Sequence, residues 1–154
     1  MAGKPHIMLV EARFYPAISD ELAKGATGAL AAAGATHERF AVPGVFEIPA
    51  AIQMAIRARS FSTLTQRFDG YVALGCVIRG ETTHYDYVCN ESVRGLQELA
   101  LRYTIALGYG ILTVENEAQA WARARVGEKN KGGAAAQACL DMIELKRRFN
   151  LYPR

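Results

Sequence analysis

Residues 74–90 read Leu74-Gly-Cys-Val-Ile-Arg-Gly-Glu-Thr-Thr-His-Tyr-Asp-Tyr-Val-Cys-Asn90, and within them the apolar pattern changes period. The first half belongs to an apolar run over residues 70–78, which predicts a buried strand. From Tyr85 to Tyr103 the apolar side chains recur every three or four residues, which predicts an amphipathic helix. We therefore expect a strand, a short glycine-containing turn and a helix in succession.

The turn at residues 79–83 suggests an anion site. Thr83 and Asp86 have the spacing of a capping box, so we expect the helix to begin here. The first N–H groups of a helix lack intrahelical partners, and the helix dipole favours negative charge beside them. Thr82 could add a hydroxyl donor, and His84 would lie in the first helical turn. We therefore expect a phosphate site with a proton-transfer group next to it.

A simpler interpretation of the same turn stays open at this point. Glycine and threonine often precede helices only because they suit turns and caps. A histidine at a helix start can equally be a surface residue. The residues alone do not decide between a capped helix and a phosphate site.

On either side of this stretch, strand and helix patterns alternate along the chain. We expect strands at residues 6–12, 36–42, 70–78 and 108–114. We expect helices at about residues 19–33, 45–58, 85–103, 116–124 and 133–149, and a loop or short extra turn at 59–67. Alternation of this kind predicts right-handed crossovers and a parallel sheet. The predicted fold is α/β, a single-domain three-layer sandwich over residues 1–154, with a four-stranded parallel sheet, helices on both faces and flavodoxin-like topology.

Composition narrows the class of protein. Apolar residues make up 51% of the chain and charged residues 21%, which is ordinary for a globular domain. No apolar run approaches the roughly 20 residues of a membrane span, and residues 1–5 are too short and polar for a signal peptide. The cysteines Cys76, Cys89 and Cys139 lack the spacing of a zinc site or disulfide framework. We expect a cytoplasmic protein with no metal. A net charge of +3 and scattered basic residues do not suggest nucleic-acid binding.

The central stretch resembles the main motif of the lumazine synthase family. The matching residues are Gly75-x-Val-Ile-Arg-Gly-x-Thr-x-His-x-Asp-x-Val88, followed by Asn90-Glu91. Further matches follow in the family's order at Arg13-Phe14, residues 42–49, residues 113–116, residues 119–120, Arg123 and residues 130–132. The resemblance covers nearly the whole chain. It implies a transferase of riboflavin biosynthesis that uses no cofactor. Such an enzyme condenses 5-amino-6-(D-ribitylamino)uracil with 3,4-dihydroxy-2-butanone 4-phosphate to give 6,7-dimethyl-8-ribityllumazine. This reaction is the penultimate step of the pathway.

The resemblance also implies a role for each matching position. His84 would transfer protons. The butanone phosphate would be bound by Glu81 and Thr82 in the turn and by the guanidinium of Arg123. The ring of the ribitylaminouracil would stack on Phe14, and its ribityl chain would contact Val45, Phe46 and Glu47. Its pyrimidine edge would contact Cys76, Val77 and Ile78. Lys131 would be a further, basic contact to this substrate.

Some positions depart from the family pattern or allow a second interpretation. Cys76 takes a place often held by Thr and donates only weakly. Tyr109, which the resemblance also implies as a substrate-binding residue, takes a place often held by Phe. From sequence alone, Phe14 could equally close the core, and Glu47 could merely complement a helix N-terminus.

The family builds its sites between neighbouring subunits, so the resemblance implies a homopentamer or a multiple of one. We expect a free pentamer, because little chain precedes the first strand. The alternatives are a flavodoxin-like FMN module and a non-catalytic flavin- or lumazine-binding protein on the same fold. The FMN module is disfavoured because its phosphate turn would be Glu11-Ala-Arg-Phe-Tyr-Pro16, which contains no Gly, Ser or Thr.

Overall fold

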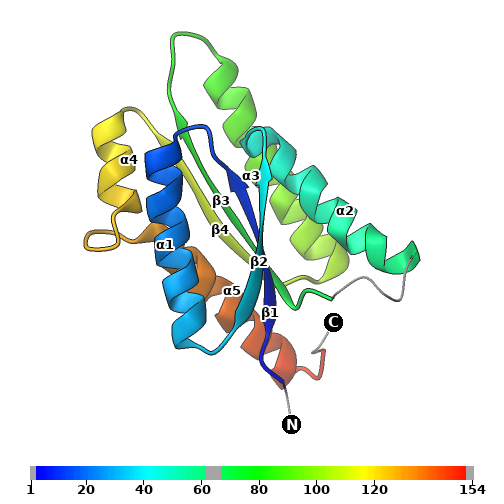
Figure 1. Ribbon diagram of the computed structural model, residues 1–154. Helices are drawn as coiled ribbons and strands as arrows, with labels where there is room; N and C mark the ends of the chain where they lie inside the picture. Colours follow the sequence, from blue (N-terminus) through cyan, green and yellow to red (C-terminus); the bar gives the residue numbers. More distant parts are fainter. Residues whose placement is uncertain (1–2, 62–66, 152–154) are drawn as a thin grey trace.

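A computed structural model describes residues 3–61 and 67–151 as a parallel sheet covered by helices on both faces (Figure 1). The strands are β1 (His6–Ala12), β2 (Thr36–Val42), β3 (Gly70–Ile78) and β4 (Leu107–Val114), and the sheet order is β2-β1-β3-β4. Each neighbouring pair is parallel. This confirms the predicted α/β fold, and the order has the start of the flavodoxin-like arrangement. Within the described residues, no helix has the length and apolarity needed to cross a bilayer.

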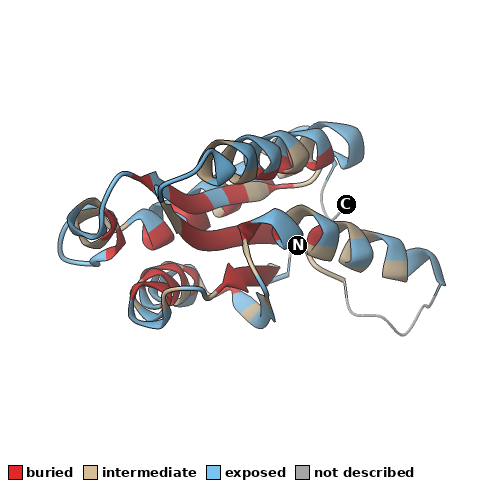
Figure 2. Ribbon diagram, turned by 90° about the horizontal axis from the view of Figure 1, so that it is seen from above, coloured by how far each residue is buried: buried red, intermediate tan, exposed pale blue. Residues whose placement is uncertain are grey.

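Two apolar layers lie on opposite faces of the sheet because side chains of a strand alternate between them. On β1, Ile7 and Leu9 join the layer under α1 (Pro16–Ala32), α4 (Glu117–Ala124) and α5 (Lys131–Arg148). Met8 and Val10 join the opposite layer, under α2 (Ile48–Phe61) and α3 (His84–Tyr103). Figure 2 shows buried residues concentrated in the sheet and on the helix sides that face it. The central strands β1 and β3 are therefore covered on both faces.

The predicted strand bounds agree closely with the structure, whereas some helix starts do not. β1, β2 and β3 have the predicted bounds, and β4 begins one residue early, at Leu107. Helix α1 begins at Pro16 rather than Ser19, because proline fits the first helical position, where its missing N–H costs nothing. A 3₁₀ turn, η1 (Val45–Glu47), precedes α2. Helix α2 continues through the start of the predicted loop to Phe61, and residues 62–66 of that loop lie outside the described residues.

Candidate active site

A pocket of about 690 Å³ opens at the carboxyl ends of β1 and β3. Its lining comes from the ends of these strands and from the turns that follow the strands, namely Ala12, Phe14 and Tyr15, residues 43–47 and 76–78, and Gly80 with Thr82. The first turns of α3 complete it. Ligands of parallel α/β sheets bind at this edge. The pocket is therefore the natural candidate for a substrate site.

The turn between β3 and α3 leaves its backbone amides available. Among the described residues, the N–H groups of Gly80, Glu81, Thr82 and Thr83 donate no hydrogen bond, and all four residues are exposed. Thr82 Oγ1 accepts from the N–H of His84 at 3.3 Å. Free amides at the start of a long helix can bind an anion.

The predicted capping box is wrong, although the helix does begin where it was expected. Thr83 is the N-cap of α3, but its backbone is helical (φ −73°, ψ −2°) and its side chain makes no capping hydrogen bond. A side-chain cap needs an extended N-cap residue, whose oxygen can then reach the second or third amide. The carboxylate of Asp86 bonds instead to Arg79.

His84 is the first residue of α3 and lines the pocket with an exposed side chain. Tyr87, Val88 and Glu91 follow it at helical spacing and line the same wall. These three were not predicted as pocket residues, although counting three, four and seven positions from His84 would have found them. The imidazole therefore faces the pocket from a helix wall that also carries an aromatic ring and a carboxylate.

Arg79 ties the turn to the neighbouring strand end. Its Nε donates to Glu115 Oε2 at 2.9 Å and its Nη2 to Asp86 Oδ1 at 3.3 Å. Its guanidinium carbon lies 4.3 Å from the centre of the Tyr85 ring, a cation–π geometry. The hydrogen bond with Asp86 is the main cause of a raised pKa of Arg79, which stays charged. The turn is thereby joined to the residues that follow β4.

Phe14 lies in the loop after β1 and does not close the core, because 72% of it is exposed. Its ring meets that of Tyr15 edge to face, with centroids 4.9 Å apart. It also lines the pocket, so a flat ligand ring could stack on it.

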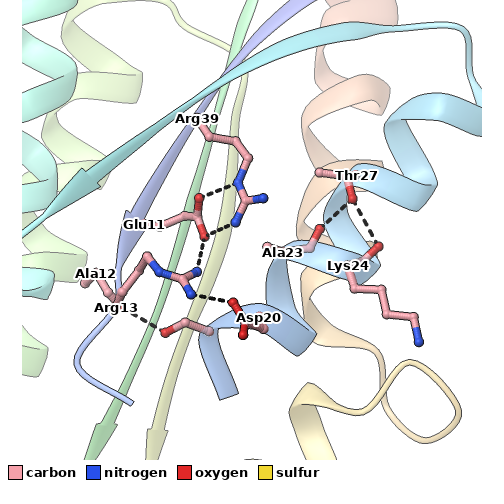
Figure 3. A network of polar contacts seen from close by, with 9 residues as sticks. Glu11, Ala12, Arg13, Asp20, Ala23, Lys24, Thr27 and Arg39 are labelled. Carbon is pink, nitrogen blue, oxygen red and sulfur yellow. Dashed lines mark hydrogen bonds and ion pairs between the residues drawn. The ribbon is translucent and has the colours of Figure 1, made fainter. Parts of the chain in front are cut away.

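A buried carboxylate holds this loop at its base (Figure 3). Glu11 is 3% exposed and accepts hydrogen bonds from Arg39 at 2.7 and 2.9 Å and from Arg13 at 2.9 Å. Arg13 also pairs with Asp20 of α1. A buried charge is costly unless paired, and here two arginines from opposite sides pair with it. The network joins β1, β2 and α1 immediately before Phe14.

The opposite wall is η1, which lies against β3. Val45 is buried, whereas Phe46 and Glu47 are exposed and line the pocket. A Cβ placed on Gly75 would lie 2.6 Å from Val45 Cγ1, so only glycine lets η1 approach β3 this closely.

Cys76, Val77 and Ile78 form the strand end beneath the pocket. Burial raises the pKa of the Cys76 thiol to about 11, so it stays protonated at neutral pH and serves at most as a weak donor.

The other predicted site residues do not line this pocket. They are Glu81, Tyr109, Arg123 and Lys131. Arg123 lies on α4, where its Nη1 donates to the carbonyl of Gln119 at 3.1 Å, and Lys131 is exposed at the start of α5. Tyr109 lies on β4, and burial raises the pKa of its hydroxyl. Helices α4 and α5 cover the face of the sheet opposite α3.

Comparison with known proteins agrees with this geometry. The family model of 6,7-dimethyl-8-ribityllumazine synthase matches residues 4–147. The chain belongs to the lumazine synthase family. A 6,7-dimethyl-8-ribityllumazine synthase of Bartonella tribocorum is 55% identical over 149 residues, which cover 97% of this chain and 95% of the relative. That of Agrobacterium fabrum is 54% identical over 147 residues, covering 96% and 98%. A 6,7-dimethyl-8-ribityllumazine synthase 1 of Rhizobium meliloti is 57% identical over 144 residues, covering 94% and 93%.

Membership of the lumazine synthase family confirms the resemblance found in the sequence. Across residues 3–61 and 67–151, no three side chains of His, Cys, Asp or Glu gather in a way that could hold a metal ion. The pocket offers free amides for a charged group, an imidazole and an exposed aromatic ring, which are groups that an acid–base condensation can use.

Proposed function

We propose that the protein, as one lumazine synthase domain over residues 1–154, condenses 5-amino-6-(D-ribitylamino)uracil with 3,4-dihydroxy-2-butanone 4-phosphate. The products are 6,7-dimethyl-8-ribityllumazine, phosphate and water. This makes it a transferase of riboflavin biosynthesis that uses no cofactor. The observation that carries the proposal is the row of free amides at residues 80–83 with His84 beside it, in a member of the lumazine synthase family. Gly80, Thr82 and His84 line the pocket.

The phosphate substrate binds at the turn. The amides of Glu81 and Thr82 and the Thr82 hydroxyl donate to its phosphate, while the exposed Glu81 carboxylate stays outside the pocket lining. The 5-amino nitrogen of the pyrimidine attacks the ketone carbon, and the carbonyl oxygen leaves as water when the imine forms. Breaking the C–O bond then releases phosphate. Attack of the ribitylamino nitrogen on the neighbouring carbonyl carbon closes the ring and expels that carbonyl oxygen as a second water, which completes the lumazine. His84 moves protons in these steps.

The pyrimidine substrate occupies the rest of the pocket. Its ring stacks on Phe14, and the backbone of residues 76–78 meets its polar edge. Its ribityl chain follows Val45 and Phe46 and bonds to Glu47, whose carboxylate accepts hydrogen bonds from hydroxyl groups. Holding both substrates in attack geometry supplies a large part of the rate enhancement.

A neighbouring copy supplies the remaining groups. Tyr109, Arg123 and Lys131 do not line the pocket of their own chain, which supports sites built between subunits of a homopentamer. In this arrangement Arg123 of the neighbour binds the phosphate as a guanidinium fork, and its Lys131 contacts the pyrimidine. Such an enzyme acts on small molecules in the cytoplasm.

Mixing the purified protein with both substrates tests the proposal directly. Product formation is followed by the absorbance of the lumazine, and phosphate release is measured in parallel. We expect equal amounts of both products. Absence of product together with tight binding of riboflavin would instead support the non-catalytic flavin-binding alternative.

A further inference from the structure

Asp86 stands where a carboxylate could block the phosphate site. It is the third residue of α3, the position from which an acidic side chain reaches back to the N-cap amide in a capping box. Here that amide belongs to Thr83, which is next to the two amides proposed to bind the phosphate and is the last of the free amides at residues 80–83. A carboxylate bonded there would take a donor from the substrate and repel its charge.

In the structure the carboxylate is held elsewhere. Asp86 Oδ1 accepts from Arg79 Nη2 at 3.3 Å, while the Thr83 amide donates to no group in the described part of the chain. Arg79 is fixed in turn by Glu115 at 2.9 Å and by the Tyr85 ring. Because Arg79 is not among the residues that line the pocket, its contacts suit a role in placing Asp86 rather than in binding substrate.

We propose that Arg79 is a positioning residue, which holds the Asp86 carboxylate away from the amides of residues 80–83 and so keeps them open to the phosphate group. This inference rests on the proposed function, since it assigns a task to a residue beside the same site. Arg79 acts through Asp86, so its removal harms phosphate binding only while that carboxylate is present.

The test is a double-mutant cycle with Arg79→Gln and Asp86→Asn, measured in the complete protein. We expect Arg79→Gln to raise the KM for the butanone phosphate roughly tenfold, with kcat and the pyrimidine KM changed less than about twofold. Inorganic phosphate should also bind about tenfold more weakly, as followed by phosphorus NMR. Adding Asp86→Asn should restore both values to within about twofold of wild type.

Arg102→Gln is the matched control, because Arg102 forms an exposed ion pair with Glu98 at 3.1 Å near the other end of α3. It should leave both KM values unchanged. If Arg79→Gln does not fold, the Asp86→Asn variant is measured alone. We expect its KM for the butanone phosphate to stay at or below the wild-type value, and a rise in that KM would overturn the proposal.

Other outcomes separate the inference from the proposed function. A double variant as weak toward phosphate as Arg79→Gln would overturn the inference, because Arg79 would then bind phosphate itself. So would an active wild type whose Arg79→Gln variant loses only thermal stability. A wild type that makes no lumazine would overturn the proposed function, and this inference with it.

Discussion

His84 moves protons in the proposed reaction, and its exposed side chain lines the pocket beside the free amides of residues 80–83. General acid–base groups contribute about 10²- to 10⁴-fold to a rate. We therefore expect His84→Ala to lower kcat by about that factor while the dissociation constant of ribitylaminouracil changes less than roughly threefold. Steady-state kinetics and calorimetric titration measure the two quantities.

His37→Ala provides the control for this substitution. His37 is a part-buried histidine on the edge strand β2 and does not line the pocket. Its variant should keep wild-type turnover. Equal losses in turnover and pyrimidine binding for His84→Ala would show that His84 binds substrate rather than transferring protons.

Burial of the Cys76 thiol should make the free energy of unfolding fall as the pH becomes alkaline. Its folded-state pKa is raised from 9.0 to about 11 by burial, so the folded protein holds this proton more tightly than the unfolded chain. The contribution of this tighter proton binding to the free energy of unfolding is complete below pH 9 and is lost as the pH rises toward 11. We expect the free energy of unfolding to fall less over this range in Cys76→Ala than in wild type, as measured by urea denaturation at several pH values.

The comparison between the two proteins cancels other groups that titrate in this range. Cys139 is one of them, because burial raises its thiol pKa to about 12. A difference between wild type and Cys76→Ala that stays constant from pH 8 to pH 11 would mean that the Cys76 thiol is not shielded from water.

At the scale of elements, Gly108 lets α5 lie directly on β4. A Cβ on Gly108 would lie 1.9 Å from the carbonyl oxygen of Ala135, a backbone atom that cannot move without the helix. We expect Gly108→Ala to lower the free energy of unfolding by at least about 2 kcal/mol, because overpacking forces backbone shifts. Gly28→Ala, in α1 with no atom within 4 Å, should raise it by about 0.5–1 kcal/mol. Urea denaturation compares them, and equal effects would contradict the packing argument.

The elements themselves were largely predictable because their signals are local. The apolar runs at residues 7–10 and 70–78 and the alternation along β2 are visible within a few residues, and the bounds of these three strands were confirmed. Capping at Thr83 was not predictable in the same way. It depends on a backbone angle and on Arg79, which is itself anchored by Glu115, 36 positions away in sequence. Contacts of that range follow from the fold and not from local spacing.

The same distinction applies to the site. Residues 76–84 are contiguous, and Phe14 and η1 follow neighbouring strands, so parallel topology alone gathers them at one edge. No such rule predicts the positions of Tyr109, Arg123 and Lys131 relative to the pocket. They lie on β4, α4 and α5, which contribute no residue to the pocket lining, so in the proposed pentamer their place would depend on how copies assemble.

At the scale of the whole molecule, that separation leads to a test of the assembly. If one chain supplies His84 and its neighbour supplies Arg123, the variants His84→Ala and Arg123→Ala are defective in different halves of each site. Co-refolding equal amounts should then create sites in which both wild-type residues meet. In a ring of heterologous contacts with random mixing, about one site in four is intact.

We therefore expect each variant alone to be nearly inactive and the co-refolded mixture to recover about a quarter of wild-type activity. Mass photometry of the same samples checks that each forms the same oligomer, which we expect to be a pentamer. Mixing the variants without refolding is the control, since intact rings do not exchange subunits unless they dissociate. A mixture no more active than its parts would mean that His84 and Arg123 of the same chain serve one site, and the chain would then have to bend to bring α4 to the pocket.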